Sequence, residues 1–123
     1  MAKVKKEQFH TRIINSELTY DIRKRILWPH ITNENYAIEP DNIDTTFHLG
    51  TYFKNQIISI GTFIKETNAK FACKRQYRLR AMATDKNYQV KGAGRNLFLT
   101  GLQILKTKKT MMLWCDARLN AIP

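Results

Sequence analysis

The segment Gln89–Arg95 is the clearest candidate for a functional site in this sequence. It reads Gln-Val-Lys-Gly-Ala-Gly-Arg and lies between a strand-like stretch and a helical one. A helix N-terminus has free backbone N–H groups and partial positive charge, and glycines let the backbone approach a ligand closely. With Lys91 and Arg95 beside it, this junction is suited to binding phosphate. The loop lacks the ending of a Walker A loop and the third glycine of a dinucleotide fold, so on its own it fits a plain turn equally well.

Side chains with acid–base chemistry are few around this segment. His48 could touch a substrate, although a lone histidine in a strand more often has a structural role. Glu66 and Asp85 are the acids near the loop. We expect Asp85 to shape the loop and Glu66 to end a strand, so the sequence assigns no general base.

The cysteines and histidines form neither a disulfide nor a metal pattern. Cys73 and Cys115 are far apart, and neither belongs to a Cys-x-x-Cys motif. The three histidines, His10, His30 and His48, lie at spacings that no common metal site uses. The sequence therefore predicts no metal, and Cys115, which lies in an apolar run, is expected to be buried and inert.

The charge of the chain indicates an anionic partner. Its 123 residues include 21 Lys and Arg against 10 Asp and Glu, which gives a net charge of +11. The stretch Lys65–Arg95 holds nine basic residues and two acids, so it carries 9 − 2 = +7 of this total. Such an excess suits a nucleic acid, an acidic surface or a phosphorylated cofactor.

Length and composition are those of one ordinary globular domain. Hydrophobic residues make up 43% and charged residues 25%, which argues against wholesale disorder. No apolar run approaches the roughly 20 residues of a membrane span. No apolar segment follows the basic start Met1–Lys6, as it would in a secretory signal. We therefore expect a single domain over residues 1–123, located in the cytoplasm.

Five segments have the composition of strands. In the second, Phe47, Leu49, Thr51 and Phe53 occupy one face and alternate with residues on the other, and a tight turn should join it to the third as a hairpin. The continuous apolar run of the fifth favours a strand covered on both faces, as in a parallel pairing. The expected strands are Gln8–Asn15, Thr46–Lys54, Gln56–Glu66, Gln76–Thr84 and Met111–Cys115.

Two helices are predicted between these strands. The first is capped by Ser16, repeats Leu18, Ile22 and Ile26, and ends near Trp28, because Pro29 disfavours helix at the residue before it. The second is strongly amphipathic, with Gly94, Leu97, Phe98, Gly101, Leu102 and Leu105 on one face.

The segments between these elements are polar. His30–Asp44 is expected to be irregular with a short helix around Asn33–Ala37, and Thr67–Arg75 is expected to be a charged loop. The resulting order, β-α-β-β-β-α-β, predicts the α/β class, in the form of an α+β mixed sheet.

These elements, taken with the loop, resemble the GNAT-type, acetyl-CoA-dependent N-acetyltransferases. Tyr77–Thr84 followed by Tyr88–Gly94 is similar to the acetyl-CoA motif of that superfamily, a strand ending in Met-Ala-Val or similar and then Arg/Gln-x-x-Gly-x-Gly/Ala. Ile22–Pro29 and Phe47–Gly50 resemble the first helix and second strand of bacterial members, and Leu113–Ala121 resembles the strand and helix start that follow. The resemblance covers nearly the whole chain in the right order, so it is more specific than the loop alone.

The resemblance implies a GNAT-like acyl-CoA N-acyltransferase fold with acetyl-CoA as co-substrate. Backbone groups of Met82 and Thr84 would hydrogen-bond the pantetheine arm, and a backbone N–H near Met82 would polarise the thioester carbonyl. An amine of a small molecule or peptide would attack the thioester directly, where the strand Gln76–Thr84 separates from the strand Met111–Ala117. The pyrophosphate would be held by the loop residues Gln89, Val90, Lys91, Gly92, Ala93, Gly94 and Arg95.

The chain departs from the family pattern at its C-terminal end. It stops at Ile122-Pro123, before the usual Phe-Tyr-x-x-x-Gly-Phe segment, whose tyrosine often protonates the leaving thiolate. Arg118 stands where many relatives have Asn. We therefore expect a C-terminally truncated acetyltransferase domain, in which the strand Met111–Ala117 lacks a neighbour and could pair with a second copy as a homodimer.

Two other functions stay open from the residues. The missing segment favours a relative that binds acyl-CoA without catalysing transfer. The basic stretch Lys65–Arg95, with Tyr77 and Tyr88 for stacking, would instead suit a small nucleic-acid-binding module. Against that module, no nucleic-acid motif is present and the cations surround the phosphate loop, so a nucleic-acid partner is not expected.

Overall fold

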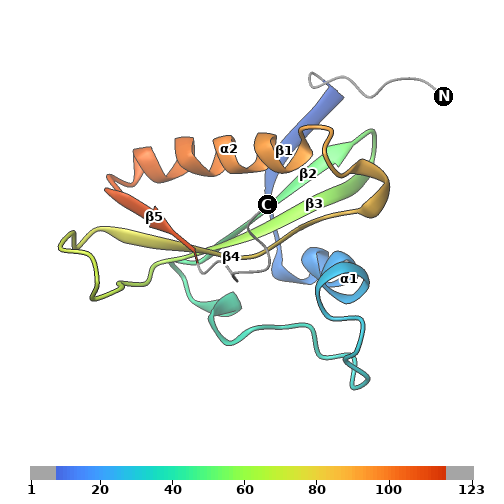
Figure 1. Cartoon of the computed structure of the whole chain (residues 1–123), viewed down its shortest axis with the longest axis horizontal. Helices are drawn as coiled ribbons and strands as arrows, with labels where there is room; N and C mark the ends of the chain where they lie inside the picture. The colour runs from blue at the N-terminus through green and yellow to red at the C-terminus, as the bar shows by residue number, and fades with distance from the viewer. Residues whose placement is uncertain (1–7, 116–123) are drawn as a thin grey trace.

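The computed structural model describes residues 8–115 and shows a five-stranded mixed sheet with a long helix across one face (Figure 1). The strands follow one another in chain order, β1-β2-β3-β4-β5. Neighbours from β1 to β4 are antiparallel, whereas β5 runs parallel to β4. The predicted mixed sheet and order of elements are thereby confirmed. The strands are β1 (Phe9–Ile14), β2 (Phe47–Phe53), β3 (Gln56–Ile64), β4 (Gln76–Thr84) and β5 (Met112–Trp114).

The helix α2 (Ala93–Thr107) covers the face of the sheet that is uppermost in Figure 1. Its residues Leu97 and Leu105 are buried and pack against Phe47, Phe63 and Leu79 of the sheet. Burial of each leucine contributes about 2 kcal/mol to folding. The predicted amphipathic spacing is therefore confirmed as the spacing of a core-facing stripe.

The strands β2 and β3 form the predicted hairpin, and Lys54 in its turn takes a positive φ of 57°. Every residue of β2 from Phe47 to Thr51 is buried, because α2 covers one face and the segment after β1 covers the other. The edge strand β5 is less buried than its apolar run predicts, since all three of its residues are half-buried. The parallel pairing expected of β5 is nevertheless confirmed.

The first predicted helix is wrong in form, because the segment after β1 is a chain of three short turns. These are the 3-10 turn η2 (Ser16–Thr19), the single α-helical turn α1 (Tyr20–Ile22) and the π-helical turn η3 (Arg23–Leu27). The predicted N-cap is wrong as well, since η2 follows Asn15 and the Ser16 carbonyl instead accepts a hydrogen bond from Thr19 Oγ1 at 2.6 Å. The predicted end near Trp28 is confirmed, because the Trp28 N–H donates to the Arg23 carbonyl and closes the π-type turn.

The short helix expected at Asn33–Ala37 is absent, and a 3-10 turn forms later, at η4 (Glu39–Asn42). Two asparagine side chains account for the difference. The Asn33 side chain accepts the N–H of Asn35, and the Asn35 side chain accepts the N–H of Ala37. Such local turns satisfy the backbone in a non-helical conformation and compete with a helix.

Two further observations concern the surface. Cys115 is exposed at the end of the described part of the chain, so the burial predicted for it is wrong. Within residues 8–115, no helix has the length and apolar character that crossing a membrane requires. The expectations that rest on Asp116–Ala121, including Arg118, lie outside the described residues.

Candidate functional site

The turn that leads from β4 into α2 presents backbone N–H groups to solvent. Gly92 is the N-cap of α2 with φ of 97°, a left-handed conformation that glycine adopts without the cost of a side chain. The first backbone bond of the helix runs from the Asn96 N–H to the Gly92 carbonyl at 2.9 Å. The N–H groups of the three residues between them therefore have no partner within the helix and point out of its N-terminus. We call Gln89–Arg95 the phosphate cradle.

Side chains from two strands hold the first turn of α2 in place. Thr11 of β1 donates a hydrogen bond to Asn96 Oδ1 at 2.6 Å and shares another, also of 2.6 Å, with Thr51 of β2. Because Thr11 gives its proton to Asn96, Thr51 donates in the bond between the two hydroxyls, and Thr51 Oγ1 also lies 3.5 Å from the Ala93 carbonyl oxygen. The orientation of the cradle is thus fixed by the sheet beneath it.

Asp85 shapes the loop that leads into the cradle, as the sequence predicts. Its Oδ1 accepts the N–H of Asn87 at 3.0 Å, and its Oδ2 accepts Arg25 Nη1 at 2.8 Å. The Asn87 N–H and the Arg25 guanidinium hold the pKa of Asp85 below its usual value, although burial opposes them. A carboxylate held in this way is a structural anchor rather than a free base. Tyr88, next in the loop, packs beneath it against Phe53 with 5.4 Å between ring centroids.

The second half of β4 has an open edge. The strand β5 pairs with β4 only along Gln76–Arg78. Beyond this the pairing with β3 shifts register, and Ala81 takes a positive φ of 53°. After this bulge the Asp85 N–H donates to the Ile58 carbonyl of β3 at 2.7 Å.

The backbone groups on that open edge belong to Met82 and Thr84. Successive residues of a strand direct their backbone N–H and C=O groups to alternate sides. Because Asp85 faces β3, the groups of Thr84 and Met82 face away from it. The Thr84 carbonyl accordingly accepts the Gln89 side-chain amide at 3.0 Å instead of a strand partner. The described chain places no strand beside this edge.

The phosphate cradle and the open edge meet at Gly94. A Cβ atom added there would lie 3.3 Å from Met82 Cε and 3.5 Å from Thr84 Oγ1. The structure thus brings together Met82, Thr84 and Gln89–Arg95, the residues that the sequence predicted for cofactor binding. Lys91 and Arg95 are exposed beside them and add positive charge.

His48 is not part of this assembly. It lies on β2, two strands away from β4, where it pairs with Ile14 of β1. Its side chain is buried, and His48 Nε2 lies 2.9 Å from Asp41 Oδ1. The two residues line a separate groove of about 510 Å³ between the end of β1 and η4.

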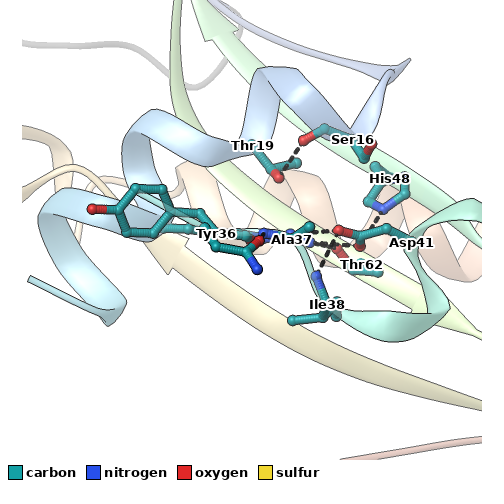
Figure 2. Close-up of polar contacts among 10 residues, drawn as sticks. Ser16, Thr19, Tyr36, Ala37, Ile38, Asp41, His48 and Thr62 are labelled. Carbon is teal, nitrogen blue, oxygen red and sulfur yellow. Dashed lines mark hydrogen bonds and ion pairs between the residues drawn. The ribbon is translucent and has the colours of Figure 1, made fainter. Parts of the chain in front are cut away.

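The partner of Asp41 is a fully buried arginine that sequence reasoning did not single out. Arg23 Nη1 donates to Asp41 Oδ2 at 2.7 Å and to the Tyr36 carbonyl at 2.8 Å. Arg23 Nη2 donates to Asp41 Oδ1 at 3.0 Å and to Thr62 Oγ1 of β3 at 2.9 Å. Figure 2 shows the residues of this network, with His48 and Ile38 on either side of the Asp41 carboxylate and Thr62 close by. The sequence signal for Arg23 is weak. It directly follows Ile22, which belongs to the apolar face of the first predicted helix.

This buried network holds the irregular segment before β2 against the sheet, on the face opposite α2. Burial opposes ionisation of Asp41, but hydrogen bonds from Arg23, His48 and the Ile38 N–H outweigh it and lower the pKa of Asp41 to about 2. The Trp28 ring lies 5.8 Å from the Arg23 guanidinium and covers it. Trp28 thus serves as a packing contact of the buried network.

One relative of known sequence aligns with most of the chain. It is the uncharacterized N-acetyltransferase YitI of Bacillus subtilis (strain 168), which is 35% identical over 107 residues. The alignment covers 87% of this chain and 72% of the relative. No protein-family model matches the chain.

Solved structures of acetyltransferases have the same fold. An aminoglycoside N-acetyltransferase in complex with CoA superposes with a TM-score of 0.76 at 13% identity, over 91% of this chain and 78% of its own. A GNAT family acetyltransferase of Staphylococcus aureus superposes with a TM-score of 0.70 at 18% identity, over 94% of this chain and 91% of its own. An aminoglycoside acetyltransferase from an uncultured soil sample gives 0.72 at 11% identity, over 96% and 90%.

Proposed function

Because this chain belongs to the GNAT superfamily of N-acetyltransferases, we propose that it binds acetyl-CoA across the phosphate cradle and the open edge of β4 and transfers the acetyl group to an amine. The observation that carries the proposal is the meeting of these two features at Gly94. A cradle of helix N–H groups suits the pyrophosphate, and an unpaired strand edge suits the amide groups of pantetheine. We further propose residues 1–123 as one acetyltransferase domain.

The cradle would hold the pyrophosphate through the N–H groups at the start of α2. Lys91 and Arg95 would balance part of the negative charge, and their exposure leaves them free to follow the phosphates. The N–H and carbonyl groups of Met82 and the N–H of Thr84 would pair with the pantetheine arm as a strand would. The Thr84 carbonyl is already engaged by Gln89, so it would have to accept a second donor.

The transfer step we propose is direct attack. The amine nitrogen, after losing a proton, bonds to the thioester carbonyl carbon while the C–S bond breaks, and CoA leaves as a thiolate that takes up a proton. The Met82 N–H would stabilise the negative charge that develops on the carbonyl oxygen. Neither Asp85 nor His48 is placed to act as the base, because Asp85 is held by its ion pair with Arg25 and His48 is buried on β2, two strands away from β4.

The acceptor we propose is an amine of a small molecule or a peptide. Support comes from solved structures of the same fold, since one is an aminoglycoside acetyltransferase in complex with sisomicin. Another is a ribosomal-protein-alanine N-acetyltransferase of Brucella melitensis, whose name indicates a protein acceptor.

Calorimetric titration with acetyl-CoA and CoA tests the binding half of the proposal. We expect saturable binding that Gly94→Asp abolishes, because the new carboxylate would stand against Met82 and repel the phosphates. The control is Gln103→Asp, which introduces the same charge at an exposed position of α2 and should leave affinity within twofold. Absence of binding to the parent protein would overturn the proposed function.

Initial rates and protein mass test the transfer step. Direct attack predicts intersecting double-reciprocal plots when acetyl-CoA and an amine acceptor are varied together. It also predicts no acetylated protein after incubation with acetyl-CoA alone, although Cys73 and Cys115 offer thiols. A covalent acetyl group on either cysteine that an added amine then removes would replace direct attack with a two-step mechanism.

A further inference from the structure

The surface has a second concentration of positive charge, which we call the basic end face. It is formed by the loop between β3 and β4 and by the C-terminal end of α2. Seven exposed cations lie in these two segments: Lys65, Lys70, Lys74, Arg75, Lys106, Lys108 and Lys109. The three at the end of α2, Lys106, the C-cap Lys108 and the following Lys109, interact favourably with the helix C-terminus, but the four on the loop have no such explanation.

The basic end face is remote from the phosphate cradle. The two lie at opposite ends of α2 (Figure 1), whose 15 residues span about 22 Å at 1.5 Å per residue. The single basic stretch of the sequence, Lys65–Arg95, is therefore divided by the fold. Its first four cations belong to the basic end face, and Lys86, Lys91 and Arg95 surround the cradle. Acetyl-CoA bound in the cradle would leave the first group without an anion.

A pocket of about 390 Å³ is lined by four of these seven cations. Lys65, Lys74, Arg75 and Lys108 line it, together with Thr45 and Thr110, and no acidic side chain is among its lining residues. Within residues 8–115 none of these four cations has an ion pair. The nearby Glu66 is engaged by Arg78 at 3.2 Å. The face therefore has uncompensated charge, which an anionic ligand would relieve.

The loop of this face is ordered and presents an aromatic ring among its cations. The Gln76 side chain, 2% exposed, accepts the Asn68 N–H at 2.9 Å and donates to the Asn68 and Cys73 carbonyls. This holds the two arms of the loop together. At its tip the Phe71 N–H donates to the Asn68 carbonyl, and the Phe71 side chain is 39% exposed directly after Lys70.

We propose that the basic end face binds single-stranded nucleic acid, with the cations on the phosphates and Phe71 stacked on a base. Exposed rings together with a cationic groove are the combination by which proteins hold single strands without reading their sequence, and here Phe71 lies on the same loop as three of the cations that line the pocket. A small phosphate compound would use the pocket but not the ring. The site is independent of the proposed acetyl-CoA site, because no residue belongs to both.

Fluorescence anisotropy with a labelled 12-nucleotide oligouridine tests the proposal. The variant Lys74→Glu/Lys108→Glu should lower the affinity at least tenfold. The matched control Lys91→Glu/Arg95→Glu makes the same change in net charge at the cradle and should lower it less than threefold. For about four phosphate contacts, the affinity should fall with a log–log slope near −3 in salt. Equal losses in the two double variants would overturn the proposal, since binding would then follow net charge alone.

Two further measurements separate this proposal from its rivals. Phe71→Ala should weaken oligouridine binding about fivefold and leave heparin binding unchanged. Equal effects on both ligands, or none on oligouridine, would overturn the nucleic-acid assignment and leave a general polyanion site. Acetyl-CoA titration of Lys74→Glu/Lys108→Glu should match the parent, which shows that the variant is folded. The oligouridine result does not depend on acetyl-CoA, so each proposal can fail without the other.

Discussion

The two ends of α2 both carry positive charge, but they are built differently. At the N-terminal end the main donors are backbone N–H groups, set by the left-handed conformation of Gly92 and by Thr11 and Thr51 beneath the first turn. At the C-terminal end the donors are side chains of Lys and Arg on a loop that Gln76 holds closed. The first end depends on exact backbone geometry and the second on the number of charges.

This difference has a practical consequence for recognition. A backbone cradle offers fixed donors to one small group, so a change of conformation at a single residue should disable it. A surface of flexible cations loses affinity in steps, one charge at a time, and is strongly screened by salt. Both ends rest on the same sheet, which the buried network around Asp41 stabilises from the other face.

The largest effect should come from a change that destabilises the sheet on which both ends of α2 rest. Asp41→Ala leaves Arg23 buried without its carboxylate partner, so we expect the free energy of unfolding to fall by about 3–5 kcal/mol. Urea denaturation measures this loss. Asp44→Ala, at an exposed position in the same segment, is the control and should cost less than about 0.5 kcal/mol. A loss below 1 kcal/mol for Asp41→Ala would show that the network does not support the sheet.

The same carboxylate should make stability depend on acid pH. The pKa of Asp41 is lowered from 3.8 to about 2 in the folded protein, so the folded state favours the ionised form. Its contribution, about 2 kcal/mol at 1.36 kcal/mol per unit, is complete above pH 4 and is lost as the pH falls through 2. The stability gap between the parent and Asp41→Asn, measured by denaturation at pH 7, 4 and 2, should therefore narrow below pH 4. A gap that stays constant to pH 2 contradicts this assignment.

A change of backbone conformation should separate the two ends. Gly92→Val places a β-branched residue at φ of 97°, which costs about 1–2 kcal/mol, so acetyl-CoA affinity should fall about five- to thirtyfold. Gly92→Asn is the control, because asparagine tolerates this conformation, and it should stay within threefold of the parent. Oligouridine binding should be unchanged in both variants. If valine and asparagine bind acetyl-CoA equally well, the geometry of this turn does not govern the cradle.

Single charge reversals should give the smallest effects and the sharpest contrast. Lys91→Glu is expected to weaken acetyl-CoA binding about threefold at low salt and to leave oligouridine binding within twofold. Lys109→Glu should do the reverse. Calorimetry and anisotropy on the two variants give four affinities. An equal loss of affinity for acetyl-CoA and for oligouridine in either variant would mean that the two ends do not bind their ligands independently.

The elements that position the cradle could be predicted from the sequence because local patterns specify them. The stripe from Gly94 to Leu105, the alternation in β2 and the glycines before α2 each lie within one element, and the structure confirms the strands and helix they indicate. The segment Ser16–Leu27 could not be predicted in the same way. Its turns are set by the burial of Arg23 against Asp41 and Thr62, 18 and 39 residues away in sequence, and no local spacing contains those contacts.

The candidate site could be predicted only where its residues are close together in sequence. Residues of one continuous run, Gln89–Arg95, could be placed together from the sequence, and the resemblance added Met82 and Thr84. The division of the basic stretch between two ends of α2 could not be foreseen, because it depends on where β4 and the helix carry each cation. The structural role of His48 could not be predicted either. Its partner Asp41 reaches it only because the segment before β2 folds back onto the sheet.

The way that segment is attached has a consequence for sequence variation. Between Trp28 and Phe47 the chain contacts the Arg23 network through only three residues, Tyr36, Ile38 and Asp41. The stretch Pro29–Asn35 is exposed or half-exposed, and its link to those residues is the Ile31 carbonyl, a backbone group that accepts the Tyr36 hydroxyl at 3.2 Å. Insertions and substitutions there should accumulate with little effect on folding. Evolution could remodel this stretch while the sheet and the cradle stay unchanged.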